Sequence, residues 1–206
     1  WGSSLAFAGQ MFGIDIEVFM VKISFDQKPY RKLMMQSFGA KCNSSPSSLT
    51  DFGKKLLEEN PDNPGSLGIA ISDAIESVVK SEGKAKYSLG SVLGHVLMHQ
   101  TINGNEAILQ MEQAGDYPDI IVGCTGGGSN LSGLMFPFLG QQLRGGKKID
   151  IIGCEPLSCP SFTKGKYAYD HGDMAKMTPL IKMHTLGSDF LPPANHSGGL
   201  RYHGMS

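Results

Sequence analysis

The segment DIIVGCTGGGSNLSG, residues 119–133, joins an apolar, strand-like run to a helix-like run through three consecutive glycines. A buried strand, a tight turn and a helix in this order are typical of an α/β fold with a parallel sheet. Ligands of such sheets bind at the carboxyl ends of the strands, where the next helix offers unpaired N–H groups and a partial positive charge. The segment therefore predicts an anion site, suited to a phosphate, at residues 126–130.

Other glycine-rich motifs fit this segment less well. No Gly-Lys-Ser/Thr follows, which excludes a nucleotide P-loop. Leu131 stands where a dinucleotide fingerprint requires Gly or Ala. The ribose-binding acidic residue of that fingerprint lies about 20 positions further on, at the end of the next strand, and only Glu155 comes near this position. Ser129 or Asn130 can cap the helix and can also donate to an anion. The remaining alternative is a tight turn without a ligand.

Strand-like and helix-like segments alternate on both sides of this motif. Helices are expected at 1–13, 28–40, within 44–66, at 67–83, at 95–115 with a break near 103–104, and at 129–143. Strands are expected at 14–23 and 40–45, within 84–92 up to a turn at Gly90, at the start of 119–128 before a glycine loop, and at 147–156. The C-terminal part reads as loop-rich, with Met, His and Pro, and no strand is expected in it. Apolar strands of this kind are covered on both faces, so we predict a three-layer α/β fold with mostly parallel sheets and helices on each side.

Composition narrows the possible classes of protein. The 206 residues carry a net charge of −1, which gives no electrostatic reason to expect nucleic acid or an anionic membrane as a partner. No apolar run approaches the roughly 20 residues of a membrane span. The four cysteines, Cys42, Cys124, Cys154 and Cys159, form no CxxC pair. They predict buried free thiols in a reducing compartment, and hence a cytoplasmic protein.

The motif GGGSNLSG, residues 126–133, is similar to the phosphate-binding loop of the tryptophan synthase beta family, which are fold-type II pyridoxal-phosphate enzymes. Three further stretches agree with this family: WGSSLAFAG (1–9), YSLGSVLGHVLMHQT (87–101) and LGSDFLPPANHSGGLRYHG (186–204). The pattern most resembles the second, beta-like branch. Because the four stretches occur in order along the whole chain, the resemblance implies the fold of this family and pyridoxal phosphate as its cofactor.

The resemblance also implies roles for individual positions. The phosphate would be held by Gly126, Gly127, Gly128, Ser129 and Asn130, while Gly90 and Ser91 would lie beside the cofactor ring. Trp1 would follow the loop that binds the substrate carboxylate through backbone N–H groups. Asp189 would engage the serine side chain and help to close the site. Carbonyls of Gly126, Ser188 and Phe190 would resemble the monovalent-cation site of the family.

The same resemblance divides the chain and suggests that it is incomplete. Residues 1–85 would form a mobile communication-type subdomain, and residues 86–206 part of the large cofactor-binding domain. The chain starts in mid-helix and ends in a Gly-rich turn, which is expected of an internal fragment. None of its lysines has the His-Lys-x-Asn context of the family's Schiff-base lysine. We therefore expect no serine turnover by this chain alone.

The implied activity of the parent enzyme is the joining of L-serine, or phosphoserine, with indole to give L-tryptophan. A homodimer and a tryptophan synthase alpha chain are the implied protein partners. Two alternatives stay open: another fold-type II enzyme, such as a cysteine synthase or threonine deaminase, and a non-catalytic anion-binding or assembly module. His95 and His99 share one helix face, but HVLMH lacks the Glu of a zinc motif, so packing near the sheet is preferred to metal binding.

Overall fold

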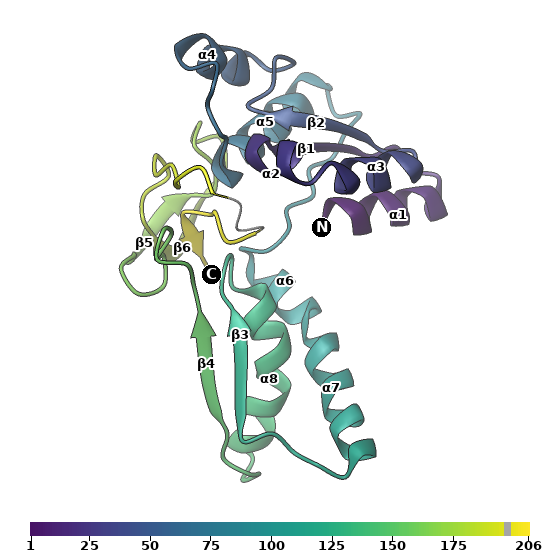
Figure 1. Ribbon diagram of the computed structural model, residues 1–206, viewed down its shortest axis with the longest axis vertical. Coiled ribbons are helices and arrows are strands. Elements are labelled where there is room, and N and C mark those ends of the chain that lie inside the picture. The colour runs from purple at the N-terminus through teal and green to yellow at the C-terminus, as the bar shows by residue number, and fades with distance from the viewer. Residues whose placement is uncertain (196–198) are drawn as a thin grey trace.

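The computed structural model describes residues 1–195 and 199–206, so positions 196–198 of the motif at 186–204, including His196, lie outside the described residues. The elements are α1 (Gly2–Phe12), β1 (Glu17–Val21), α2 (Lys22–Gln27), α3 (Pro29–Ser37), β2 (Lys41–Ser45), α4 (Asp51–Glu59), α5 (Leu67–Lys80), α6 (Gly94–His99), α7 (Thr101–Ala114), β3 (Ile120–Cys124), α8 (Ser129–Leu143), β4 (Asp150–Cys154), β5 (Lys166–His171), β6 (Leu180–Thr185) and β7 (Gly204–Met205). Two parallel strand pairs and one antiparallel sheet confirm the α/β class within the described part (Figure 1).

The first parallel pair, β1–β2, lies among the helices of the N-terminal part. Its register runs from Glu17 opposite Lys41 to Val21 opposite Ser45. A core cluster joins α1 and α3 to the edge of β2 through Ala6, Met35, Ala40 and Cys42. Pro29 stands in the first turn of α3, as expected, because its fixed φ suits a helix start and its missing N–H would be unpaired there anyway.

The second parallel pair, β3–β4, is packed on one face by α8, with α7 lying against α8 (Figure 1). Ile108, Ile121, Phe138 and Ile149 form the core between these elements. A Cβ at Gly104 of α7 would lie 2.4 Å from a backbone oxygen of α8, so only glycine permits this close helix contact. On the opposite face of the pair, apolar side chains of both strands remain about half exposed.

The C-terminal part contains an antiparallel sheet that the sequence does not predict. β5 pairs with β6, and β6 pairs with the short β7. The strand sequences KYAYDH and LIKMHT mix charged, histidine and apolar residues, so they lack the apolar run by which the parallel strands are recognised. The prediction of loops for this region is therefore wrong at residues 166–171, 180–185 and 204–205.

Two other predictions need correction. Residues 84–92 do not form a strand, because they pair with no other strand and instead form a connection between α5 and α6. Val92 is nevertheless buried, and Tyr87 and Leu89 pack beside it. Their apolar side chains reflect this packing. The helical run at 95–115 is interrupted at Gln100, between α6 and α7, and not near residues 103–104. Gly104 is required for helix packing, which explains why it does not end the helix.

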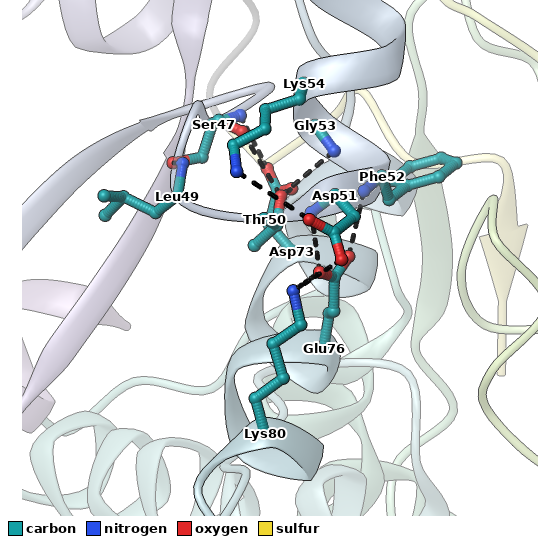
Figure 2. A network of polar contacts seen from close by, with 10 residues as sticks. All are labelled: Ser47, Leu49, Thr50, Asp51, Phe52, Gly53, Lys54, Asp73, Glu76 and Lys80. Atoms are coloured by element: carbon teal, nitrogen blue, oxygen red, sulfur yellow. Dashed lines mark hydrogen bonds and ion pairs between the residues drawn. The ribbon is translucent and has the colours of Figure 1, made fainter.

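Asp73 of α5 fixes the loop that follows β2 (Figure 2). Its fully buried carboxylate accepts hydrogen bonds from Ser45 Oγ at 2.6 Å, from the Ser47 N–H at 3.1 Å and from Thr50 Oγ1. Burial raises the pKa of Asp73, and these hydrogen bonds act in the opposite direction. The Thr50 hydroxyl also accepts from the Gly53 N–H at 3.0 Å and so caps α4.

One turn further along α5, Glu76 extends this network. Its carboxylate accepts from the backbone N–H groups of Asp51 at 2.6 Å and Phe52 at 3.0 Å, which are otherwise unpaired at the start of α4. Lys80 pairs with Glu76 at 2.6 Å and with Asp51 at 2.8 Å (Figure 2). The first turn of α4 is therefore attached to α5 through polar contacts.

α5 also contacts the C-terminal part of the chain. Ser72 Oγ donates to Asp173 at 2.9 Å and accepts from the Ala175 N–H at 2.9 Å. The Met174 N–H donates to the Gly68 carbonyl at 3.2 Å. The division into residues 1–85 and 86–206 stays a prediction, but a helix of the first part is hydrogen-bonded to a loop of the second. None of the described helices is long and apolar enough to cross a membrane.

Candidate functional site

The predicted anion site lies between the end of β3 at Cys124 and the start of α8 at Ser129. We call residues 125–128 the glycine loop. Gly128 is the N-cap of α8 and has a φ of 104°, a conformation that residues with a Cβ rarely adopt. Asn130 Nδ2 donates to the Cys124 carbonyl at 3.2 Å, which ties the first turn of the helix back to the strand. The polypeptide is thereby held in a sharp turn with the helix start at the strand end.

The backbone N–H groups of residues 126–130 have no acceptor among the residues that the structure describes. The first hydrogen bond of the helix runs from the Ser132 N–H to the Gly128 carbonyl at 3.1 Å. The hydroxyl of Ser129, a residue that is only 4 % exposed, likewise has no partner in the described part of the chain. Unpaired donors at the N-terminus of a 15-residue helix are suited to bind an oxyanion.

Two other segments that the sequence singled out lie against the glycine loop. A Cβ at Gly127 would lie 2.5 Å from Ser91 Oγ and 2.7 Å from the Ser91 carbonyl oxygen. A Cβ at Gly126 would lie 2.7 Å from the Gly199 carbonyl oxygen. From the other end of the chain, the Ser206 N–H donates to the Gly127 carbonyl at 3.1 Å. The structure therefore brings residues 91, 126–128 and the C-terminal segment together, and their role toward a cofactor stays a prediction.

Gly90 and Trp1 also meet. A Cβ at Gly90 would lie 2.7 Å from Cδ1 of the Trp1 indole, so glycine permits this contact. The Trp1 residue is nevertheless 61 % exposed. The Trp1 carbonyl accepts from the Leu5 N–H at 2.9 Å in the first turn of α1. The predicted role of the Trp1 backbone in binding substrate stays a prediction.

Asp189 lies on the surface, in the loop after β6. Its carboxylate is 3.6 Å from Lys176 Nζ, and both side chains are more than half exposed. The neighbouring Ser188 is buried at 5 %, and the Phe190 N–H donates to the Gly187 carbonyl at 2.9 Å. Within residues 1–195 and 199–206, no three His, Cys, Asp or Glu side chains are grouped to hold a metal ion. The carbonyl site predicted for a monovalent cation at Gly126, Ser188 and Phe190 uses other ligands and stays a prediction.

Arg201 is a residue of this region that sequence reasoning missed. It is 1 % exposed, and its Nη2 donates to the carbonyls of Pro192 and Pro193 at 3.0 Å each. Its Nε and Nη1 are buried without an acceptor in the described part of the chain. Burial lowers the pKa of the guanidinium. By bridging these carbonyls, Arg201 holds the loop that carries Asp189. The sequence signal that could have indicated a buried Arg201 is its position as a charged residue in the otherwise apolar and aromatic run LRYHG, residues 200–204.

The two histidines of α6 face the same side of the helix, as their spacing predicts. The rings of His95 and His99 are 5.8 Å apart in an edge-on arrangement, and both side chains are exposed. The expectation that they serve helix packing is therefore wrong. α6 is only six residues long, and its buried side is occupied by Val96.

Comparison with known proteins decides the family. A family model described as pyridoxal-phosphate dependent enzyme matches residues 1–195. The chain belongs to the pyridoxal-phosphate dependent enzymes. This membership confirms the resemblance noted in the sequence and identifies pyridoxal phosphate as the family's cofactor. The roles of individual residues toward that cofactor stay predictions.

Within this pyridoxal-phosphate family, curated relatives match the entire chain. Tryptophan synthase beta chain 2 of Thermotoga maritima is 58 % identical over 100 % of this chain and 48 % of the relative. Tryptophan synthase beta chain 2 of Aeropyrum pernix is 55 % identical over 100 % of this chain and 46 % of the relative. The chain thus spans about half the length of the curated relatives that it matches. Among solved structures, a threonine deaminase from T.th. has a TM-score of 0.61 at 17 % identity, over 99 % of this chain and 52 % of that one, which supports the fold alone.

The glycine loop fits the phosphate of this cofactor. Its donors are unpaired backbone N–H groups and one hydroxyl, which suit a dianion. A substituted Cβ at Gly126 or Gly127 would meet neighbouring backbone within 2.7 Å, so the loop can hold this shape only with glycine. A hollow lined by Gly9 of α1 and by Ile16 and Phe38, which precede β1 and β2, lies away from the glycine loop.

Proposed function

We propose that these 206 residues are one part of an enzyme that joins L-serine to indole and forms L-tryptophan. The observation that carries this proposal is the set of unpaired N–H groups at residues 126–130, in a chain that is 58 % identical to a tryptophan synthase beta chain 2. Pyridoxal phosphate, when bound, supplies the electron sink for exchange of the β-substituent of an amino acid. The protein supplies binding, orientation and exclusion of water.

In this proposal each part of the site has a separate task. The N–H groups of residues 126–130 and the Ser129 hydroxyl bind the phosphate, so the position of the cofactor is fixed at the end of β3. Gly90 and Ser91 lie beside the ring, and the absence of a side chain at Gly90 permits the contact with the Trp1 indole. Trp1 follows the backbone that binds the substrate carboxylate. Gly126, Ser188 and Phe190 supply carbonyls to a monovalent cation.

When the site is closed over the substrate, the Asp189 carboxylate accepts a hydrogen bond from the hydroxyl of the serine substrate. In the structure its carboxylate faces Lys176 at 3.6 Å, a surface ion pair of the kind that contributes little to stability. Replacing the Lys176 ion pair by a hydrogen bond from the serine hydroxyl therefore costs little free energy. A carboxylate at this point repels a phosphoryl group, which favours L-serine over phosphoserine as the substrate.

The complete enzyme is proposed to form a homodimer and to associate with a tryptophan synthase alpha chain. These 206 residues by themselves are proposed not to turn over serine, because none of their lysines stands in the His-Lys-x-Asn context of the family. In isolation they would act as an anion-binding module. Cysteine synthase and threonine deaminase activities are the competing reactions for the complete enzyme.

The test compares a protein of the relatives' length that includes this segment with the 206-residue chain, both supplied with pyridoxal phosphate. The longer protein is expected to form tryptophan from L-serine and indole, and the shorter one to form none. Release of ammonia from threonine, or cysteine synthesis, without tryptophan formation by the longer protein would contradict the proposed reaction. Tryptophan formation by the 206-residue chain alone would contradict the proposal that it lacks the Schiff-base lysine.

A further inference from the structure

Two of the four cysteines lie side by side at the carboxyl ends of the second parallel pair. Cys124 is the last residue of β3 and Cys154 is the last residue of β4, and the register places them directly opposite each other. Both thiols are free, and both residues are exposed, so the expectation of burial is wrong for these two. The arrowheads of β3 and β4 point in the same direction, toward the C-terminal end of the chain (Figure 1). The pair therefore lies immediately before the glycine loop.

The side chains of both cysteines lie on the same face of the strands. At the preceding register position, Cβ atoms added to Gly123 and Gly153 would lie 2.8 Å and 3.1 Å from the two methyl groups of Leu131 in α8. Position 123 and position 153 therefore face the helix. Because successive side chains alternate, Cys124 and Cys154 face away from it.

The spacing of the strands suits a covalent link between these thiols. Neighbouring strands lie about 4.8 Å apart, and the Cα atoms of disulfide-linked cysteines lie roughly 4.4–6.8 Å apart. We propose that Cys124 and Cys154 form a redox-sensitive dithiol, which a low-molecular-weight disulfide such as oxidised glutathione converts to an intrachain disulfide. This site does not depend on the proposed catalytic function.

The reaction is a pair of thiol–disulfide exchanges. One cysteine thiolate attacks a sulfur of oxidised glutathione, forms a mixed disulfide and releases one glutathione thiolate. The second cysteine thiolate attacks the protein sulfur of that mixed disulfide, forms the Cys124–Cys154 bond and releases the other glutathione. The two protein thiols lose two electrons and two protons, and oxidised glutathione is reduced to two molecules of glutathione.

The other two cysteines provide an internal comparison. Cys42 and Cys159 are buried, as the sequence predicts. Burial raises the pKa of Cys42, and burial raises the pKa of Cys159 to about 11, which keeps both sulfurs in the thiol form. The thiol form is a poor nucleophile. Reaction in the folded protein is therefore expected to be confined to the pair at the strand ends.

Closure of this disulfide would act on the anion site through the main chain. The Cys124 carbonyl accepts from Asn130 Nδ2, and the Cys154 carbonyl accepts from the Thr125 N–H at 2.7 Å and from Thr125 Oγ1 at 3.1 Å. The Cβ atoms of a disulfide lie about 3.8 Å apart, closer than the roughly 4.8 Å between neighbouring strands, so closure draws the strand ends together and shifts the glycine loop. Oxidised protein is expected to bind pyridoxal phosphate more weakly than reduced protein.

The experiment equilibrates the native, reduced chain with glutathione buffers of increasing oxidised fraction and then maps the cysteines by mass spectrometry. The expected product is a single peptide pair linked through Cys124 and Cys154, with loss of two hydrogen atoms and of two titratable thiols. Cys124→Ser and Cys154→Ser variants are expected instead to retain one bound glutathione at the remaining cysteine. Dithiothreitol is expected to restore both thiols in the wild type.

Two results would overturn the proposal. Accumulation of glutathione on both cysteines of the wild type would show that the sulfurs do not reach each other. Absence of reaction at both positions, under conditions where the unfolded chain reacts at all four cysteines, would show that the pair is not available to oxidants. Binding of pyridoxal phosphate by the oxidised and reduced chains, measured by calorimetry, then tests the effect on the anion site.

Discussion

At the scale of single residues, the glycine loop owes its shape to what a side chain would meet. Gly127 packs against Ser91, while Gly128 needs a positive φ. These are separate requirements, one of space and one of backbone conformation, and together they leave the N–H groups of residues 126–130 without an acceptor in the described part of the chain. The loop therefore has donors in place before an anion arrives, which reduces the cost of ordering on binding.

Gly127→Ala tests this role of the loop. The new Cβ would lie 2.7 Å from the Ser91 carbonyl oxygen, so the backbone has to move and the N–H groups move with it. Loss of one charge-assisted hydrogen bond costs about 1.5–3 kcal/mol, so affinity for pyridoxal phosphate is expected to fall roughly tenfold to a hundredfold. Calorimetric titration measures this change. Gly94→Ala is the matched control, since a Cβ there meets nothing within 4 Å; an equal loss in both variants would contradict the role assigned to Gly127.

The sequence predicts this loop because its signals are local. Three glycines, a preceding apolar strand and a following helix lie within 15 residues of one another. The expected capping of this helix by Ser129 or Asn130 is wrong, because Gly128 is its N-cap and no side chain caps it. Arg201 could not be predicted in the same way, because its burial depends on carbonyls of Pro192 and Pro193 that only the folded chain brings to it. The exposure of Cys124 and Cys154 could not be predicted for a related reason. It follows from which face of β3–β4 the helix α8 covers.

At the scale of elements, Asp73 determines how the loop after β2 is attached to α5. Its partners Ser45, Ser47 and Thr50 all donate to it, and Figure 2 shows Ser47 and Thr50 beside it. Asp73→Asn places an amide N–H₂ group where an acceptor is needed. It is expected to lower the free energy of unfolding by about 1–3 kcal/mol, measured by urea denaturation. Asp62→Asn, at an exposed loop position, is the control and is expected to leave stability nearly unchanged.

His203 connects the start of α5 to the antiparallel sheet. Its Nε2 is 2.9 Å from the His171 carbonyl, and its Nδ1 faces Gly68. Burial lowers the pKa of this imidazole, although the carboxylates of Asp170, Asp173 and Asp189 act to raise it. The fold therefore favours the neutral ring.

Because the folded-state pKa of His203 is depressed, protonation favours the unfolded chain. The associated stability is complete above the ordinary histidine pKa of about 6.5 and is lost as pH falls below it. His203→Gln keeps a donor for the His171 carbonyl but cannot be protonated. It is expected to reduce the fall in unfolding free energy between neutral and mildly acidic pH. An identical pH profile for variant and wild type would refute this assignment.

The regular elements show where prediction from sequence succeeds. Apolar runs predict β1, β3 and β4, and a periodic run with Pro29 predicts α3, because each of these signals lies within its own element. The antiparallel strands β5 and β6 are not predicted, since their exposed tyrosines and lysines and half-buried histidines form no continuous apolar pattern. The apolar residues near Leu89 imitate a strand, although they pack as an extended connection.

At the scale of the whole molecule, α1 and α3 present a large apolar surface. Met11 and Phe12 of α1 are 64 % and 74 % exposed, and Tyr30 and Leu33 of α3 are 82 % and 56 % exposed. Surfaces of this kind drive association. The 206-residue chain is therefore expected to self-associate with rising concentration in sedimentation experiments.

Met11→Lys combined with Leu33→Lys is expected to shift this self-association to higher protein concentration. Leu157→Lys is the matched control. Leu157 is 94 % exposed in a loop outside these helices, and its replacement is expected to leave association unchanged. Equal association of the double variant and the wild type would show that another surface is responsible.

The most direct measurement of the central claim is a calorimetric titration of this chain with pyridoxal phosphate and, separately, with pyridoxal. We predict saturable binding of pyridoxal phosphate at one site, competition by inorganic phosphate, and much weaker binding of pyridoxal, because the N–H groups of residues 126–130 recognise the phosphate. Equal affinity for the two compounds, or binding that phosphate does not displace, would contradict this claim.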